Sequence, residues 1–198
     1  MNRIAELFEG QRVMAILRGF SPERSVELAE RAWDLGIGLV EVPVQSQHSL
    51  VALAAVVEAG ARRGRSVGAG TVVSTAQLEQ VSAMGATFAV SPGFDIRLVE
   101  SAAERGLAYL PGVGSATDIQ LAAGAGVTHL KAFPAGVLGP NWFRAMRGPF
   151  PDVVLVATGG IDAANASQFL AAGAAAVAVG SALEDDRQLS ELARLVQP

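Results

Sequence analysis

The feature that most constrains this chain is a regular alternation of short apolar segments with amphipathic stretches, repeated eight times in 198 residues. The apolar segments begin about 20 to 27 residues apart, which leaves room for a strand, a turn, a helix and a return loop. They are continuous runs of Val, Ile, Leu and Ala, typical of strands buried on both faces of a parallel sheet. The predicted strands are Val13–Leu17, Leu39–Val44, Ser66–Val72, Phe88–Ser91, Ala108–Pro111, His129–Phe133, Val153–Ala157 and Ala176–Gly180.

The stretches between these segments are predicted to be helices. Several begin with a capping signal, such as Ser21 before a proline and Ser74 before Thr75. Glycine follows most of them, as at Gly36 and Gly85, which is the expected left-handed termination before a return strand. The predicted helices are Pro22–Leu35, Ser49–Ala61, Thr75–Met84, Ile96–Arg105, Ala116–Ala123, Asn141–Met146, Ala163–Ala172 and Glu184–Leu195.

Eight β-α units in one chain predict an α/β fold of the (β/α)8 TIM-barrel type, with compact loops. The alternative is a doubly wound open sheet. Near-even spacing without a long excursion favours the closed barrel. No linker interrupts the repeats, so we expect residues 1–198 to form a single domain.

Composition excludes several classes of function. No apolar run approaches the roughly 18 residues of a membrane span, and the first ten residues lack the apolar core of a signal peptide. The chain has no cysteine, which fits a cytoplasmic location. A net charge of −4 without a basic stripe argues against nucleic acid as a partner. The cationic cluster at Arg62, Arg63 and Arg65 is interpreted as a solvated helix end.

Lysine occurs once, against fourteen arginines, and Lys131 lies inside the apolar segment His129–Phe133. An ammonium buried without a partner is unfavourable by several kcal/mol, so it tends to lose its proton. A neutral amine is a nucleophile toward carbonyl groups, whereas a guanidinium never loses its proton in proteins. Lys131 is therefore a candidate Schiff-base lysine, although a strand-end lysine that reaches solvent is the alternative.

In a barrel of this type, functional groups gather at the carboxyl ends of the strands. Polar or glycine-rich positions follow each predicted strand. These are Arg18, Glu41 with Gln45, Thr71, Ser91-Pro92-Gly93, Pro111-Gly112, Lys131, Thr158-Gly159-Gly160 and Gly180-Ser181.

Glu41 is flanked by apolar residues on both sides, and strand alternation places Leu39, Glu41 and Pro43 on one face. A carboxylate inside a barrel is costly unless it is paired, so Glu41 is either an ion-pair partner or a general acid/base. Both interpretations pair it with Lys131. Burial would raise the pKa of Glu41, and a nearby cation would lower it.

The glycine-rich loops after the seventh and eighth strands fit a phosphate site. Loops in those positions bind phosphate in many barrels through backbone amides and a helix N-terminus. Gly159, Gly160 and Gly180 would let the backbone approach a phosphate closely.

A metal site is not expected, because His48 and His129 are the only histidines and no strand ends in Asp. His129 precedes Lys131 by two residues, and we interpret it as an interior residue satisfied by hydrogen bonds.

Seven strings occur in an order that resembles the class I 2-keto-3-deoxy-6-phosphogluconate (KDPG) / 4-hydroxy-2-oxoglutarate (KHG) aldolases. The resemblance covers about residues 4–196. The strings are Val40-Glu41-Val42, Gly68-Ala69-Gly70-Thr71-Val72, Ser91-Pro92-Gly93, Pro111-Gly112-Val113, Leu130-Lys131-Ala132-Phe133-Pro134, Gly148-Pro149-Phe150 and Thr158-Gly159-Gly160-Ile161.

The resemblance implies a lyase in which Lys131 forms a Schiff base with pyruvate and Glu41 acts as general acid/base. It further implies that the enzyme needs no cofactor and is a homotrimer. The implied binding residues are Thr71 with an arginine for the pyruvate carboxylate, Pro92 and Phe133 around the ketimine, and Gly159, Gly160, Gly180 and Ser181 for phosphate.

Some family members carry an arginine four residues after the catalytic glutamate, where this chain has Gln45. Others carry it at the end of the first strand, as Arg18 is here, so we assign binding of the pyruvate carboxylate to Arg18. Gln45 and Pro43 also resemble the sister 2-dehydro-3-deoxy-6-phosphogalactonate (KDPGal) aldolases, whereas Thr158 resembles the phosphogluconate type.

Three functions follow as hypotheses. The first is cleavage of KDPG to pyruvate and glyceraldehyde 3-phosphate, with 4-hydroxy-2-oxoglutarate or the galactonate epimer as other substrates. The second is a phosphosugar isomerase or epimerase, in which Lys131 only stabilises charge. The third is a non-catalytic phosphate-ligand sensor, against which the presence of both Lys131 and Glu41 argues.

Overall fold

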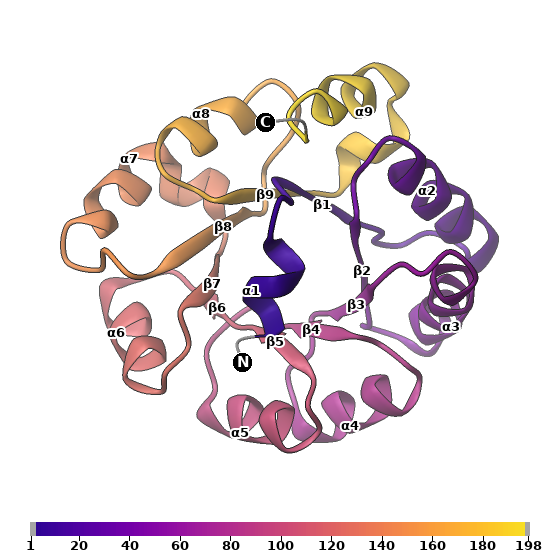
Figure 1. The fold of residues 1–198 in the computed structure, drawn as a ribbon, viewed down its shortest axis with the longest axis horizontal. Helices are drawn as coiled ribbons and strands as arrows, with labels where there is room; N and C mark the ends of the chain where they lie inside the picture. Colours follow the sequence, from indigo (N-terminus) through magenta and orange to yellow (C-terminus); the bar gives the residue numbers. More distant parts are fainter. Residues whose placement is uncertain (1–2, 197–198) are drawn as a thin grey trace.

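The strands of the chain form one closed parallel barrel. The computed structural model describes residues 3–196, apart from the side chains of residues 181, 182 and 186. The strand order is β5-β4-β3-β2-β1-β9-β8-β7-β6. Its two end strands, β5 and β6, are halves of one segment separated only by Pro111, so the sheet closes on itself (Figure 1). The strands are β1 Val13–Ile16, β2 Leu39–Pro43, β3 Val67–Gly70, β4 Phe88–Val90, β5 Ala108–Leu110, β6 Gly112–Val113, β7 His129–Ala132, β8 Val154–Thr158 and β9 Ala176–Val179.

This closure confirms the predicted TIM-type barrel and excludes the doubly wound open sheet. Every recorded strand pair is parallel. The carboxyl ends of all the strands therefore face the same end of the barrel, where the loops that follow them gather.

Helices surround the barrel as an outer ring, and α1 lies over the middle of the ring of strands (Figure 1). Side-chain caps start many of them. Ser21 accepts a hydrogen bond from the Arg24 amide at the start of α2, and Ser74 accepts one from Gln77 at the start of α4. The helices are α1 Arg3–Phe8, α2 Pro22–Asp34, α3 Gln47–Arg62, α4 Thr75–Ala83, α5 Ile96–Glu104, α6 Ala116–Gly124, α7 Ala135–Arg147, α8 Ala166–Ala171, the 3-10 turn η1 Ser181–Glu184 and α9 Asp186–Ala193.

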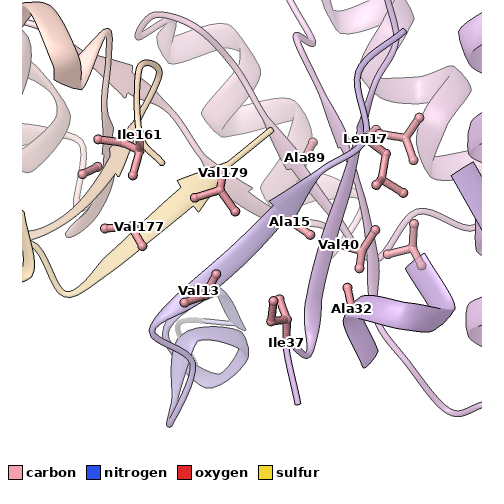
Figure 2. Packing of buried hydrophobic residues seen from close by; sticks show 14 of the residues in the cluster. Val13, Ala15, Leu17, Ala32, Ile37, Val40, Ala89, Ile161, Val177 and Val179 are labelled. Atoms are coloured by element: carbon pink, nitrogen blue, oxygen red, sulfur yellow. The ribbon is translucent and has the colours of Figure 1, made fainter. Parts of the chain in front are cut away.

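The core has two layers because successive strand residues point to opposite faces. One layer fills the barrel interior and includes Met14, Leu39 and Phe88. The other lies between the strands and the helix ring, as Ala15, Val40 and other members do in Figure 2. Polar side chains that point inward are therefore surrounded by apolar groups.

The N-terminal helix α1 was not predicted. Its Ile4, Leu7 and Phe8 pack on the interior layer, and Arg3 Nη1 donates to the carbonyl of Gly106. A six-residue helix is too short to show an amphipathic period in the sequence, and it is held by these tertiary contacts. It covers the amino-terminal end of the barrel, opposite the strand ends that carry the polar residues.

Most predicted helices differ from the observed ones by only one or two residues at an end, and three differ more. The Ala163–Ala172 helix begins only at Ala166, because the Asp162 carboxylate accepts from the amides of Ala164 and Asn165 and holds that turn. The 141–146 helix begins instead at Ala135, with a break at Gly139. The 184–195 helix is divided into η1 and α9, where Asp185 caps α9.

The cluster of Arg62, Arg63 and Arg65 lies at the C-terminal end of α3, as predicted. Arg62 pairs with Glu58, and Arg63 pairs with Asp34 and lies over the Trp33 ring. Among the described residues, none of the helices combines the length and apolar character needed to cross a bilayer.

Candidate active site

Lys131 points into the barrel from β7 and is only 2 % exposed. Its backbone amide donates to the carbonyl of Pro111, and its Nζ lies 5.0 Å from the centroid of the Phe133 ring. Burial lowers the pKa of the Lys131 ammonium, an effect that Glu41 opposes and Arg18 adds to. The predicted interior lysine is confirmed, and its environment favours the neutral amine.

Glu41 lies on β2 with its side chain inside the same barrel and is 1 % exposed. Both carboxyl oxygens are buried without a hydrogen-bond partner among the described residues. Burial raises the pKa of the Glu41 carboxyl, although the charges of Lys131 and Arg18 oppose the shift. The structure thus confirms that Glu41 faces the interior and shares an electrostatic environment with Lys131.

Gly70 makes room for Glu41. A Cβ at Gly70 would lie 1.6 Å from Glu41 Oε1, so no larger residue fits beside the carboxyl group. Glycine inside a strand often marks such a close approach. The glycines at Gly68 and Gly70 indicated a close approach in this strand. Only the structure shows that the Glu41 side chain fills the space beside Gly70.

Glu41 and Lys131 both shift toward their uncharged forms, because burial is the largest effect on each. A neutral amine can attack a carbonyl carbon, and a neutral carboxylic acid can donate a proton to the oxygen that leaves. The direction of both pKa shifts therefore favours the protonation states that imine formation requires.

A pocket of about 680 Å³ opens at the carboxyl ends of β1, β8 and β9. Arg18 belongs to its lining, and its guanidinium influences both Glu41 and Lys131 electrostatically. Gln45, by contrast, is exposed and does not line this pocket. The predicted residues that line it are Arg18, Phe133, Thr158, Gly159, Gly160 and Gly180.

Thr158 carries a buried hydroxyl in this pocket. The residue is 2 % exposed, and its Oγ1 has no hydrogen-bond partner among the described residues. A buried hydroxyl without a partner is costly. Its place in the pocket lining means that a substrate hydroxyl or carboxylate could satisfy it.

Thr71 and Pro92 lie outside the lining of this pocket, and so do Glu41 and Lys131, which are buried deeper in the barrel. Thr71 follows Gly70 and has a φ of 57°, in the left-handed region that residues with a side chain rarely adopt. The carbonyl of Pro92 lies against Gly112, which is the strand partner of Lys131. Both positions are therefore consistent with contacts to a group bound at Lys131.

The loop after β8 is held by its own polar side chains. Asn165 Nδ2 donates to the carbonyl of Gly160, while Asp162 occupies the amides of Ala164 and Asn165. Those two amides are not available to a phosphate, and α8 has only six residues. Among the amides of this loop, those of the glycines remain the candidates for binding phosphate, and a contribution from a helix N-terminus stays a prediction.

Two acidic residues line the same pocket and were not predicted, Asp162 and Glu184. The side chain of Ser181 lies outside the described residues. Ile16, Phe20 and Ile161 are further lining residues that the sequence did not single out, because apolar residues at strand ends resemble ordinary core.

His129 lies at the start of β7 and is half-buried, and its Nδ1 is 3.2 Å from the hydroxyl of Thr128. Burial lowers its pKa. It borders a different cavity with residues of α1, at the opposite end of the barrel. His129 is thus hydrogen-bonded, as the sequence suggested, but it is half-buried at the amino-terminal end of the barrel and not fully in its interior.

Comparison with known proteins shows that this chain is similar in sequence to aldolases. Residues 4–197 match the family described as KDPG and KHG aldolase. The chain is 35% identical over 172 residues to a probable 2-dehydro-3-deoxy-6-phosphogalactonate aldolase of Rhizobium meliloti, covering 86% of this chain and 81% of the relative. It is 33% identical over 182 residues to a 2-dehydro-3-deoxy-phosphogluconate aldolase of Pseudoalteromonas atlantica, covering 91% and 84%.

A solved structure is also similar. The KDPG aldolase of Legionella pneumophila, with pyruvate captured as a covalent carbinolamine intermediate, has a TM-score of 0.82 and 29% identity. The similarity covers 96% of this chain and 94% of that one.

Proposed function

The chain belongs to the KDPG and KHG aldolase family of class I aldolases, and we propose that it cleaves KDPG to pyruvate and glyceraldehyde 3-phosphate, with Lys131 as the Schiff-base residue. The observation that carries this proposal is the pairing of a buried lysine with a buried glutamate in one barrel. The carbinolamine in the Legionella pneumophila enzyme supports covalent chemistry of the same kind here.

In this mechanism the neutral amine of Lys131 attacks C2 of the keto acid. Glu41, in its acid form, donates a proton to the hydroxyl of the carbinolamine, which leaves as water and gives the iminium ion. The Glu41 carboxylate then accepts the C4 hydroxyl proton as the C3–C4 bond breaks. The aldehyde departs, and the enamine takes this proton back from Glu41 at C3. Water then adds to the resulting iminium ion and releases pyruvate and the free amine of Lys131.

The galactonate epimer is the second candidate substrate. Its support is the similarity to the Rhizobium meliloti relative, together with Gln45 and Pro43. Thr158 supports the gluconate assignment, because this position resembles the phosphogluconate type. Its buried hydroxyl, which has no partner among the described residues, could bind one C4 configuration by a hydrogen bond. The family also includes KHG aldolases, so 4-hydroxy-2-oxoglutarate is a further proposed substrate. We include the homotrimer in the proposal, and sedimentation equilibrium would measure it.

Borohydride trapping tests the function directly. With pyruvate present, reduction should add one stable adduct to Lys131, found by peptide mass spectrometry. An isomerase or a phosphate sensor would give no adduct, and an adduct solely on the N-terminal amine would contradict the proposal. Comparing kcat/KM for the two C4 epimers then assigns the substrate.

Arg18→Ala should weaken pyruvate binding by about 1.5 to 3 kcal/mol, the usual worth of hydrogen bonds to charged groups. Arg18 lines the pocket, whereas Gln45 is exposed outside it. The measurement is the pyruvate concentration that half-saturates borohydride inactivation. Arg62→Ala, at the far end of α3, is a matched control and should change nothing. If pyruvate affinity is unchanged in Arg18→Ala, a residue other than Arg18 binds the pyruvate carboxylate.

Gly180→Ala should raise the KM for phosphorylated substrate about tenfold, equivalent to roughly 1.4 kcal/mol. A Cβ at Gly180 would have only ordinary contacts, the nearest at 3.6 Å to the carbonyl of Ile16. Gly159 is a poorer choice, because its φ is 90° and a Cβ would press on the Phe133 ring. Cleavage of 4-hydroxy-2-oxoglutarate should change much less. Equal losses on both substrates would mean that the loop supports the barrel without holding phosphate.

A further inference from the structure

A chain of two buried hydroxyl groups lies beside the lysine strand and has no part in the proposed mechanism. Tyr109, the only tyrosine in the chain, lies on β5, and Ser91 follows β4. The Tyr109 hydroxyl is 2.7 Å from Ser91 Oγ, and Ser91 Oγ donates to the carbonyl of Gly93 at 2.6 Å. Both residues are buried.

The direction of these hydrogen bonds follows from the number of protons. A serine hydroxyl has one proton, and Ser91 gives it to Gly93. The bond between the two hydroxyls must therefore be donated by Tyr109. Burial raises the pKa of Tyr109 to about 12, so the phenol keeps this proton at neutral pH.

The two hydrogen bonds hold the turn formed by residues 91–93. The Ser91 amide also donates to the carbonyl of Leu110 at 3.2 Å, so this turn is tied to β5 by backbone and side chain together. Tyr109 itself packs in the layer between strands and helices.

This turn lies directly over the strand residue next to the lysine. A Cβ at Gly112 would lie 2.1 Å from the carbonyl oxygen of Pro92 and 2.7 Å from the amide nitrogen of Gly93. Gly112 pairs with Lys131 in register, and the Lys131 amide donates to the neighbouring Pro111 carbonyl. A shift of the turn would therefore be transmitted to the surroundings of the lysine.

We propose that Tyr109 and Ser91 are positioning residues that hold the Pro92 turn against the lysine strand, so that Pro92 orients the imine formed at Lys131. They touch neither substrate nor reacting atoms and act through the turn. This inference rests on the proposed function, because it requires a Schiff base at Lys131.

The test is the rate of pyruvate-dependent borohydride trapping in Tyr109→Phe, which removes the hydroxyl and keeps the ring. Loss of one link should slow imine formation about fivefold to tenfold, which corresponds to roughly 1 to 1.4 kcal/mol. The pyruvate concentration for half-saturation should stay near the wild-type value, because the carboxylate contact is elsewhere. Ser91→Ala should likewise slow trapping without changing the pyruvate concentration for half-saturation. The double variant should be no slower than the slower single variant.

Thr87→Val is the matched control. Its hydroxyl donates to the carbonyl of Val67 at 3.1 Å, at the opposite end of β4 from Ser91. It should trap pyruvate at the wild-type rate, and thermal unfolding of all the variants would show how much stability each one loses.

Each other outcome has a distinct meaning. Wild-type trapping rates in Tyr109→Phe and Ser91→Ala would overturn the positioning role and leave the aldolase assignment intact. Equal slowing in Thr87→Val would show a general effect of stability and would also overturn it. If the wild-type protein itself traps no pyruvate, the proposed function fails, and this inference fails with it.

Discussion

Lys131→Arg is expected to abolish cleavage, with a loss on the order of 10⁴-fold or more, as for removal of a catalytic nucleophile. The substitution keeps the positive charge that an electrostatic role would need. A guanidinium does not lose its proton, so it cannot form the imine. Aldehyde release from KDPG, followed with a coupled dehydrogenase, measures the effect. Near-normal turnover would rule out imine chemistry at this position.

The size of arginine requires a control, because Lys131 is 2 % exposed and surrounded by the barrel interior. Lys131→Met keeps a similar length without charge and should fold at least as stably, since no ammonium is desolvated. It should be as inactive as the arginine variant. Circular dichroism and thermal unfolding would show that both variants retain the barrel, which separates loss of chemistry from loss of structure.

Glu41→Gln is expected to slow turnover by roughly two to four orders of magnitude, the usual range for loss of a general acid/base. Glutamine has the same shape, so it fits the space above Gly70 that the carboxyl group occupies. Exchange of the pyruvate methyl protons with deuterated solvent, followed by NMR, isolates the proton-transfer step. Exchange at the wild-type rate would mean that another group is the base.

The same variant should have an opposite effect on stability. Burial raises the pKa of Glu41 above its ordinary value of 4.5, so between these two values the folded protein binds more protons than the unfolded chain. Stability therefore falls as the pH rises through this window. Glu41→Gln cannot ionise, so it should be more stable than wild type at neutral pH and should lose this part of the pH dependence. Urea unfolding at several pH values measures it.

Several parts of the site could be predicted from local sequence signals. The placement of Glu41 on the inner face followed from the two-residue period of a strand, because its neighbours at Leu39 and Pro43 share that face. Lys131 was identifiable because a single lysine in an apolar segment has few ordinary explanations. The glycine loops after β8 and β9 were recognisable from composition alone, and they do line the pocket.

Other parts had no local signal. The carboxylate of Asp162 takes two amides that could otherwise have faced a phosphate, and Glu184 lines the pocket from a turn after the last strand. The hydroxyl chain from Tyr109 to Ser91 joins residues eighteen positions apart, one on β5 and the other just after β4. A short N-terminal helix was missed because its stability depends on the interior that it covers.

The fold class and the inward-facing positions of Glu41 and Lys131 could be predicted from the sequence, since strand and helix periods are properties of neighbouring residues. Which distant side chains meet depends on the tertiary structure. The register of β1, β2 and β3 sets Ile16, Glu41 and Gly68 side by side. Closure through β5 and β6 then places Lys131 in the same interior as Glu41. Register and closure arise from packing of the whole chain, and no local pattern specifies them.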